Sequence, residues 1–349
     1  MILSDVPGDV KLSKVSPSDI EFVIKKNFNT ILFNGFNKSS YNAKNYCRSK
    51  YAVRLLRCAY NLTFLFGKDQ EGNLKSRLVD AKFCRINVCP ICHWRWSLKW
   101  RYYLSSAIDQ ILREKPSYRF LFLTLTIRNC DISELSSVLD LMAHSWSKML
   151  KLKEFANNSS IKGFFRSLEV SRSKSGQAHP HYHCLICVSS SYFKSGYYLT
   201  FENYQRIWRD SLGIDYNPSV FVKLLDSGQV RFKVGEIAKY LTKVSDLIED
   251  IEWTLRLSDH LFKVRRVSAT GIFKDKLRGI KEDDLLHITD RDLEWLELES
   301  LRLYEWQEKL KEYIENVDER VYAGEFGPEL LVSSDDLFDK VDDCDLYGL

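Results

Sequence analysis

The central part of the chain alternates between short β patterns and amphipathic helical patterns. The segment YRFLFLTLTIRN (118–129) alternates aromatic and β-branched residues and predicts a strand. Apolar residues then recur with a helical period from Leu135 to Leu150, after a capping box formed by Asp131 and Glu134. The same criteria predict three further elements, namely strands at 161–170 and 220–225 and a helix at 203–212.

The next strand carries three histidines. In AHPHYHCLIC (178–187), His179, His181 and His183 occupy alternate positions and therefore share one face. The polar, glycine-containing connection SRSKSGQA predicts a hairpin with strand 161–170, in which Glu169 faces the histidines. Two or three imidazoles with one carboxylate favour a catalytic divalent ion over a closed structural site. Solvated histidines opposite a buried face are the alternative.

Strands joined by hairpins imply an antiparallel sheet, and we expect the helices to pack on one side of it. The fold class is therefore predicted to be α+β. In VRFKVGEIAKYLTKVSDLI (230–248), an apolar helical stripe has Glu236, Tyr240 and Lys243 on its flank, at positions i, i+4 and i+7. Such a row is common on helix surfaces, so on its own it does not indicate catalysis.

Length and composition allow two domains with a sizeable core. The chain has 349 residues, of which 45% are hydrophobic and 13% aromatic. The first 50 residues show no clear period and predict an irregular arm. No apolar run approaches the roughly 20 residues of a membrane span, and the first residues lack the order of a signal peptide. We therefore expect a cytoplasmic protein with no membrane partner.

Charge is distributed unevenly along the chain. Residues 281–349 contain 7 lysine and arginine residues against 22 aspartate and glutamate residues, a net charge of −15, which leaves +19 for residues 1–280. A basic body is expected of a protein that neutralises phosphates, although many basic proteins bind no nucleic acid. The acidic end is either simply solvated or screens the body from non-specific DNA.

Three cysteines form the pattern C-x4-C-P-x-C. They are Cys84, Cys89 and Cys92, and the turn CPxC lets two thiolates meet one ion. Cys58 is the preferred fourth ligand of a predicted structural zinc site. Two residues could replace Cys58 in that site: Cys47 and His93. Buried thiols in a small core are the alternative, since the odd count of nine cysteines argues against disulfides.

The segment HWRWSLKWRYYL follows these cysteines and mixes tryptophan with arginine and lysine. This composition suits a surface that contacts the backbone and bases of DNA. Long amphipathic helices show the same mixture for packing reasons alone. The sequence leaves both interpretations open.

Several motifs together resemble one known family. The order FLTLTIRN, HPHYHCLI and EIAKYLTK, preceded by C-x4-CPxC, is similar to the rolling-circle plasmid replication initiators, a branch of the HUH endonuclease superfamily. The likeness spans about residues 55–280. The core His181-Tyr182-His183 is shared with relaxases and some transposases, whereas ExxKYxxK and the cysteines are more specific to the plasmid initiators. GIFK (271–274) resembles their downstream sequence weakly.

The resemblance implies a domain organisation and a fold. It implies an HUH endonuclease fold with an antiparallel sheet and helices on one face, preceded by a zinc-binding module, whereas the first 50 residues and the acidic C-terminal tail match no part of the family. The expected parts are an irregular arm, a four-cysteine zinc module, an HUH nickase and strand-transferase domain, and an acidic helical region, at residues 1–50, 51–115, 116–280 and 281–349.

The resemblance also implies a mechanism. His181 and His183, with Glu169 as the acidic partner and His179 as a further candidate, would bind Mg²⁺ or Mn²⁺ beside the scissile phosphate. Tyr240 would attack phosphorus and form a 5′-phosphotyrosine, leaving a 3′-hydroxyl primer.

The other residues of the helical row would have supporting roles. Lys243 would stabilise developing charge, and Glu236 would activate water for a terminating hydrolysis, unless it is an ordinary surface residue. The implied partners are single-stranded and double-stranded plasmid origin DNA, a host helicase and a host DNA polymerase, with a homo-oligomer on DNA as a further option.

Three other functions fit parts of the sequence. A relaxase or single-strand transposase would share the chemistry, although the CPxC pattern and the single tyrosine argue against both. A non-catalytic zinc-dependent DNA-binding regulator would keep the fold without nicking. A zinc hydrolase with a three-histidine site would leave the tyrosine helix unexplained.

Overall fold

The computed structural model describes two compact units. One unit comprises residues 1–84 and 289–349, and the other comprises residues 85–288. The boundary between the units falls within the four-cysteine region, and the first unit contains both ends of the chain. The sequence led us to expect four consecutive parts instead. The described residues are 17–43, 46–68, 72, 74–194, 196–237, 244–262, 264–278 and 297–322.

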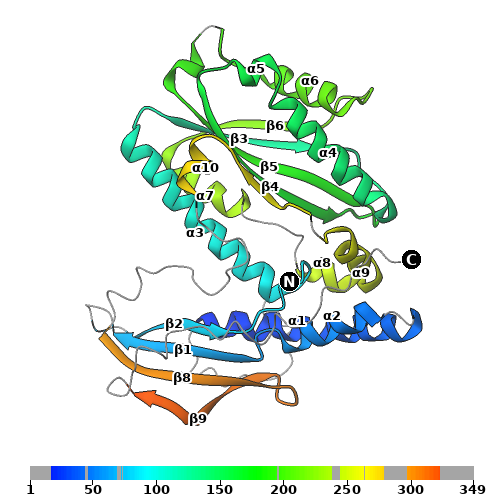
Figure 1. Ribbon diagram of the computed structural model, residues 1–349, viewed down its shortest axis with the longest axis vertical. Helices are drawn as coiled ribbons and strands as arrows, with labels where there is room; N and C mark the ends of the chain where they lie inside the picture. Colours follow the sequence, from blue (N-terminus) through cyan, green and yellow to red (C-terminus); the bar gives the residue numbers. More distant parts are fainter. Residues whose placement is uncertain are drawn as a thin grey trace. The chain divides into compact units, whose positions relative to one another are not determined.

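The first unit combines two helices with a four-stranded antiparallel sheet of order β2-β1-β8-β9 (Figure 1). Its helices are α1 (Pro17–Ala43) and α2 (Tyr46–Arg57). Its strands are β1 (Asn61–Lys68), β2 (Leu74–Ala81), β8 (Glu297–Gln307) and β9 (Glu312–Tyr322). Aromatic residues such as Phe22, Phe64 and Trp306 are buried in this unit.

Helix α1 corrects the expectation of an irregular arm over residues 17–43. Its buried positions follow a helical spacing, but two of the five are polar: Phe22, Lys26, Asn29, Leu32 and Phe36. The Lys26 ammonium is buried because it donates to the carbonyls of Leu56 and Cys58, at 2.5 and 2.6 Å. A helical stripe with polar members does not stand out in a hydrophobicity pattern.

Strands β8 and β9 correct the expectation of a helical C-terminal region over residues 297–322. β8 pairs with β1 along its length, with Leu301 opposite Leu65 and Tyr304 opposite Leu62. The Tyr304 ring also makes an edge contact with Phe64, at 6.0 Å between centroids. Pairing between segments so far apart in sequence depends on tertiary packing, which local propensity does not report.

The second unit is built on a five-stranded antiparallel sheet of order β6-β3-β5-β4-β7 (Figure 1). Its strands are β3 (Arg119–Thr126), β4 (Ile161–Arg172), β5 (Ala178–Val188), β6 (Val220–Leu225) and β7 (Val267–Ala269). The four strands expected between residues 118 and 225 are therefore confirmed, as is the α+β class with an antiparallel sheet.

The helices of the second unit include three long ones. They are α3 (Pro90–Glu114), α4 (Leu135–Met149) and α6 (Phe201–Leu212). The shorter ones are α5 (Lys153–Ala156), α7 (Ser227–Ile237), α8 (Val244–Glu249), α9 (Ile251–His260) and α10 (Ile272–Lys276). Two 3-10 turns, η2 (Ile132–Glu134) and η3 (Ser190–Phe193), complete it. The Asp131 side chain caps η2 through the Ser133 N–H, and the Glu134 side chain forms no cap for α4.

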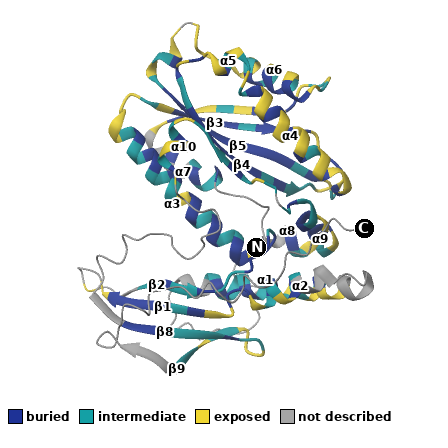
Figure 2. Ribbon diagram, viewed as in Figure 1, coloured by how far each residue is buried: buried dark blue, intermediate teal, exposed yellow. Residues whose placement is uncertain are grey.

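Helices cover both faces of this sheet, so the expectation of helices on one face is wrong. On one face, Tyr182 of β5 contacts Trp146 of α4 and Trp208 of α6. On the other, Trp100 of α3 packs on Phe165 of β4. Strand β5 is buried at every position except His179, because its two alternating sets of side chains both face helices (Figure 2).

Helix α10 begins where the backbone at residues 270–271 lies very close to the backbone at residues 162–163. Gly271 has a φ of 55°, and a Cβ added there would lie 2.1 Å from the Lys162 carbonyl oxygen. A Cβ on Gly163 would likewise lie 2.4 Å from the Thr270 carbonyl oxygen. The glycine of the GIFK segment is therefore required by packing. In the described part of the chain, no helix is both long and apolar enough to cross a membrane.

Candidate functional site

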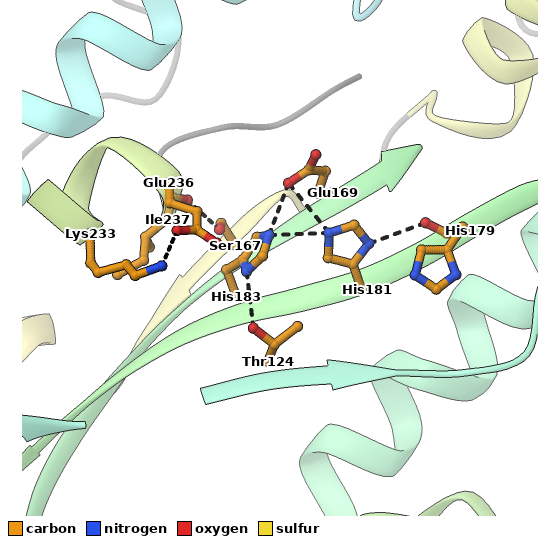
Figure 3. Close-up of polar contacts among 9 residues, drawn as sticks. All are labelled: Thr124, Ser167, Glu169, His179, His181, His183, Lys233, Glu236 and Ile237. Carbon is orange, nitrogen blue, oxygen red and sulfur yellow. Dashed lines mark hydrogen bonds and ion pairs between the residues drawn. The ribbon is translucent and has the colours of Figure 1, made fainter. Parts of the chain in front are cut away.

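Glu169, His181 and His183 converge on one point of the five-stranded sheet (Figure 3). In the β4–β5 register, Glu169 pairs with His181 and Ser167 pairs with His183, which puts all four side chains on one face. Glu169 Oε2 lies 2.9 Å from His183 Nε2 and 3.4 Å from His181 Nε2. The two Nε2 atoms are 3.1 Å apart. The predicted hairpin therefore brings the three expected ligands together.

The spacing of these three atoms fits a divalent metal ion. Ligands at about 2.1 Å from an octahedral ion lie about 3.0 Å from their neighbours, close to the three distances observed. Both histidines are buried, at 9% and 6% exposure. Two imidazoles and one carboxylate on one side would leave the remaining positions of the ion open to substrate or water.

The far side of each imidazole is held by a hydrogen-bond partner. His181 Nδ1 lies 3.2 Å from the His179 carbonyl oxygen, and His183 Nδ1 lies 3.4 Å from Thr124 Oγ1. A hydrogen bond donated by Nδ1 leaves the Nε2 lone pair available to a metal. The His183 ring also stacks on Phe122, with 5.6 Å between centroids and an angle of 19°. The rings are thus oriented before any ion binds.

The carboxyl group of Glu169 remains ionised over the ordinary pH range. Burial raises its pKa, but hydrogen bonds and charge interactions with His181 and His183 outweigh this effect and lower the pKa to about 2. A permanently charged carboxylate beside two imidazole nitrogens is a suitable set of donors for Mg²⁺, Mn²⁺ or a similar ion.

His179 lies beside the triad but is not part of it. Its Nδ1 is 2.7 Å from the Asn129 side-chain oxygen, and its ring centroid is 5.2 Å from that of His181. Burial and the nearby His181 lower its pKa, against the opposing charge of Glu169. Among the described residues, the metal-type cluster on this face contains Glu169, His181 and His183 alone.

Helix α7 approaches the same face of the sheet. The Ser167 hydroxyl donates a hydrogen bond to the Ile237 carbonyl at the end of α7 (Figure 3). Glu236 forms an ion pair with Lys233, whose ammonium lies 4.8 Å from the Phe122 ring centroid. The expected continuous helix 230–248 is described as α7 and α8, and residues 238–243 lie outside the described part. Tyr240 and Lys243 are therefore not placed.

Four supporting residues were not predicted from the sequence: Phe122, Thr124, Ser167 and Lys233. Phe122 and Thr124 alternate on β3 and face His183 across the β3–β5 pair. Ser167 precedes Glu169 by two positions, so it shares the same face of β4. The period of two along each strand could have identified these three residues once the strand order was known.

The four expected cysteines also come together. The sulfur atoms of Cys58, Cys84, Cys89 and Cys92 all lie within 4.8 Å of one another, and all four residues are buried. Backbone N–H groups point at three of these sulfurs, from Cys84 to Cys58, from Arg85 to Cys92 and from Cys92 to Cys89, at 3.2–3.5 Å. Sulfurs on a tetrahedral zinc ion lie about 3.8 Å apart, so the cluster fits zinc.

The helix that follows the cysteines uses its aromatic and basic residues for packing. In α3, Trp96 and Lys99 are each 1% exposed and Trp100 is 7% exposed. The two tryptophan rings contact each other at 6.1 Å, and Trp100 packs on Phe165. The segment HWRWSLKWRYYL was expected either to contact DNA or to pack within the protein. For these three residues, packing is the correct interpretation.

Comparisons with known proteins agree with one another. A family model described as Replication protein matches residues 75–314. A "Protein rep" of Streptococcus pneumoniae serotype 2 is 33% identical over 255 residues, covering 70% of this chain and 78% of that protein. A "Protein rep" of Lentilactobacillus hilgardii is 31% identical over 248 residues, covering 68% and 77%. A "Replication protein" of Staphylococcus aureus is 31% identical over 202 residues, covering 53% and 85%. No solved structure matches the chain significantly.

Proposed function

This chain belongs to the replication protein family, and we propose that it starts plasmid rolling-circle replication by nicking one strand of the origin with a tyrosine nucleophile. The observation that supports this most is the convergence of Glu169, His181 and His183 at 2.9–3.4 Å. A replication protein that only recognised DNA would have no need of a buried, preoriented divalent-ion site in its sheet.

The triad would hold Mg²⁺ or Mn²⁺, which supplies Lewis-acid polarisation of a phosphate oxygen. Thr124 and the His179 carbonyl keep the two imidazole rings turned toward that position. Phe122 packs against His183 and limits its movement. Together these contacts would place the scissile phosphate against the sheet, with its orientation fixed before the reaction.

Tyr240 is the proposed nucleophile. Its hydroxyl would lose a proton and form an O–P bond, while the bond from phosphorus to the 3′-oxygen breaks and that oxygen takes up a proton. The products are a 5′-phosphotyrosine and a free 3′-hydroxyl. Because Ser167 holds the Ile237 carbonyl, and three residues span at most about 11 Å, Tyr240 would stay within reach of the triad. Lys243 would stabilise charge that develops on the phosphate.

Glu236 would act at the end of a replication round. Its carboxylate lies on α7 and pairs with Lys233, outside the three-residue metal cluster. In this position it is suited to activate water against the phosphotyrosine. That hydrolysis, or transfer of the strand to a free 3′-hydroxyl, would release the DNA. A host helicase and DNA polymerase would then extend the primer.

The cysteine cluster would hold a structural Zn²⁺. Four buried thiolates around one ion leave no position for substrate, which is typical of structural sites. The backbone N–H groups that face the sulfurs would stabilise their charge. The cluster therefore contributes to folding and has no direct part in the nicking reaction.

Nicking of origin DNA tests the proposal. Single-stranded and supercoiled double-stranded origin DNA of the carrier plasmid would be incubated with the protein, with and without Mn²⁺, and cleavage mapped on a denaturing gel. We expect one nick on one strand, only in the presence of the ion. Specific binding without a divalent-dependent nick would instead identify a DNA-binding regulator. A nick at a transposon end or a transfer origin would identify a transposase or a relaxase.

A further inference from the structure

A cavity of about 520 Å³ lies on the face of the five-stranded sheet opposite the metal triad. Helix α4 forms one wall, and the segment around β7 forms another, with β4 and β5 beneath. Tyr182 and Arg166 line the cavity, while their sequence neighbours His181, His183 and Ser167 point to the triad face. The cavity shares no residue with the triad, so a ligand bound there would occupy a site separate from the proposed nicking site.

Arg166 is a buried cation, and two of its three nitrogens have no hydrogen-bond partner in the described part of the protein. The residue is 5% exposed. Two of its nitrogens, Nε and Nη1, are buried and have no hydrogen-bond partner among the described residues. Such groups are rare in folded proteins, because an unsatisfied buried donor costs stability, and they commonly indicate a water molecule, an ion or a ligand.

A second unused donor lies directly beside Arg166. Ser268 of β7 is the cross-strand partner of Arg166, so the two side chains are neighbours on the same face. The Ser268 hydroxyl is buried and also has no partner within the described part of the chain. Both residues line the cavity. A guanidinium and a hydroxyl that both lack an acceptor form a receptor for an anionic oxygen group.

The position of the guanidinium is fixed by two aromatic rings. Its central carbon lies 4.0 Å from the Tyr182 ring centroid and 5.4 Å from that of Trp146. These rings hold the guanidinium in place, and the Tyr182 side chain also forms a hydrogen bond with it, so that Nε and Nη1 are the donors left for an external acceptor. Among the described residues, the Arg166 side chain is therefore held in place without an acidic partner, which is a suitable arrangement for binding an external anion.

The remaining walls indicate the size and nature of the ligand. The volume of the cavity exceeds that of a phosphate ion and falls within the usual range of small-molecule sites. The exposed lining is more polar than apolar, and its apolar part includes side chains such as Trp146, Leu150 and Leu168. Arg265 adds a second cation to the lining. Asp140 adds a carboxylate, but this residue is exposed to solvent. A ligand with an anionic group and a flat apolar part matches these walls.

We propose that this cavity binds a nucleoside phosphate, with its phosphate against Arg166 and Ser268 and its base among the apolar walls. The nucleotide is either free or part of a DNA strand, since both present the same chemical groups. Phosphate oxygens would offer acceptors to the Ser268 hydroxyl and to one edge of the Arg166 guanidinium. The base would pack near Trp146, so the fluorescence of Trp146 would report on binding.

Titration of the full-length, zinc-loaded protein tests this site. The probes are dAMP, deoxyadenosine, inorganic phosphate and a short single-stranded oligonucleotide. Their binding is measured by calorimetry and by tryptophan fluorescence. We expect dAMP or the oligonucleotide to bind, and deoxyadenosine and inorganic phosphate each to bind at least about tenfold more weakly. Binding of dAMP identifies a free nucleotide, and binding of the oligonucleotide alone identifies a nucleotide held in DNA.

Variants separate this site from other nucleotide-binding surfaces. Arg166→Gln should weaken binding at least about tenfold, and Ser268→Ala, a smaller change that tests the site if Arg166→Gln unfolds, should weaken it by about threefold or more. Arg113→Gln removes an exposed arginine of α3 and should bind as the parent does.

Two results would overturn the proposal. One is that neither dAMP nor the oligonucleotide binds the folded parent protein. The other is binding that survives in both Arg166→Gln and Ser268→Ala, or that falls equally in Arg113→Gln. Thermal unfolding of each variant without ligand serves as the control for folding.

Discussion

The hydroxyl of Ser167 donates a hydrogen bond to the carbonyl oxygen of Ile237, the last residue of α7. Ser167 is also the cross-strand partner of His183. This one contact therefore ties the strand that carries Glu169 to the helix that precedes Tyr240. It links the two halves of the proposed site, the metal triad and the segment with the nucleophile.

Ser167→Ala should slow nicking without weakening the metal site. The change leaves the Ile237 carbonyl without its partner, which costs about 1–3 kcal/mol, and it loosens the position of the following segment. Since a misplacement of about 1 Å can cost a hundredfold in rate, we expect a ten- to hundredfold slower nick at an unchanged Mn²⁺ affinity. The measurement is single-turnover nicking beside Mn²⁺ titration calorimetry.

Ser147→Ala provides the matched control for this change. Its hydroxyl also donates to a backbone carbonyl, that of Ala143, but on the exposed side of α4. It should nick at the parent rate. An equal loss of rate in both variants, or a loss of Mn²⁺ affinity in Ser167→Ala, would show that the Ser167 contact does not position the nucleophile.

The three histidines of β5 should differ in importance. His181→Ala and His183→Ala each remove a ligand atom of the triad, so both should abolish nicking and reduce Mn²⁺ affinity by at least about a hundredfold. His179→Ala removes a residue that pairs with Asn129, so it should weaken nicking only modestly. Calorimetric Mn²⁺ titration ranks the three. Loss of Mn²⁺ binding in His179→Ala with retention in His181→Ala would reverse this assignment.

The cysteine cluster should stabilise the fold. We expect about one tightly bound zinc per chain by elemental analysis, and a clear fall in the unfolding temperature on chelation or in Cys89→Ser and Cys92→Ser, because structural zinc contributes directly to the folded state. Cys130→Ser is the control, since Cys130 is buried but lies outside the cluster. Purified folded protein without zinc would refute the structural role of the cluster.

Glu236 should matter for the end of the reaction and not for its start. Glu236→Ala removes the proposed base for water, so the first nick and the covalent adduct should form at nearly the parent rate, while hydrolytic release slows by about a hundredfold. Glu236→Tyr should place a second nucleophile four residues before Tyr240 in the chain and favour a second strand transfer. The assay is a chase of preformed adduct on denaturing gels. Loss of the first nick in Glu236→Ala would instead make it a metal ligand or a first-step base.

The sequence predicted the local parts of this site well. Alternation along β5 and the polar hairpin before it were sufficient to bring Glu169 to His181, because the register of a short hairpin follows from its turn. The helix face at Tyr204, Ile207, Trp208 and Leu212 is likewise buried as its period indicated.

Features that depend on distant contacts were not predicted. Three histidines on one alternating set of β5 are typical of a polar face, so the sequence predicted helices on the opposite face alone, although both sets are buried. Helix α1 was not predicted because Lys26 and Asn29 belong to its buried stripe. The pairing of β8 with β1 joins residues more than two hundred positions apart, which no local pattern reports.

The covalent intermediate tests the central claim most directly. A labelled origin oligonucleotide would be incubated with Mn²⁺ and either the parent protein or Tyr240→Phe, and the products separated under denaturing conditions and analysed by mass spectrometry. We predict a 5′-phosphoryl adduct on Tyr240 in the parent and none in Tyr240→Phe, which keeps the aromatic ring and should retain its affinity for the oligonucleotide. An adduct that persists in Tyr240→Phe, or a Mn²⁺-dependent nick without any adduct in the parent, would contradict the account.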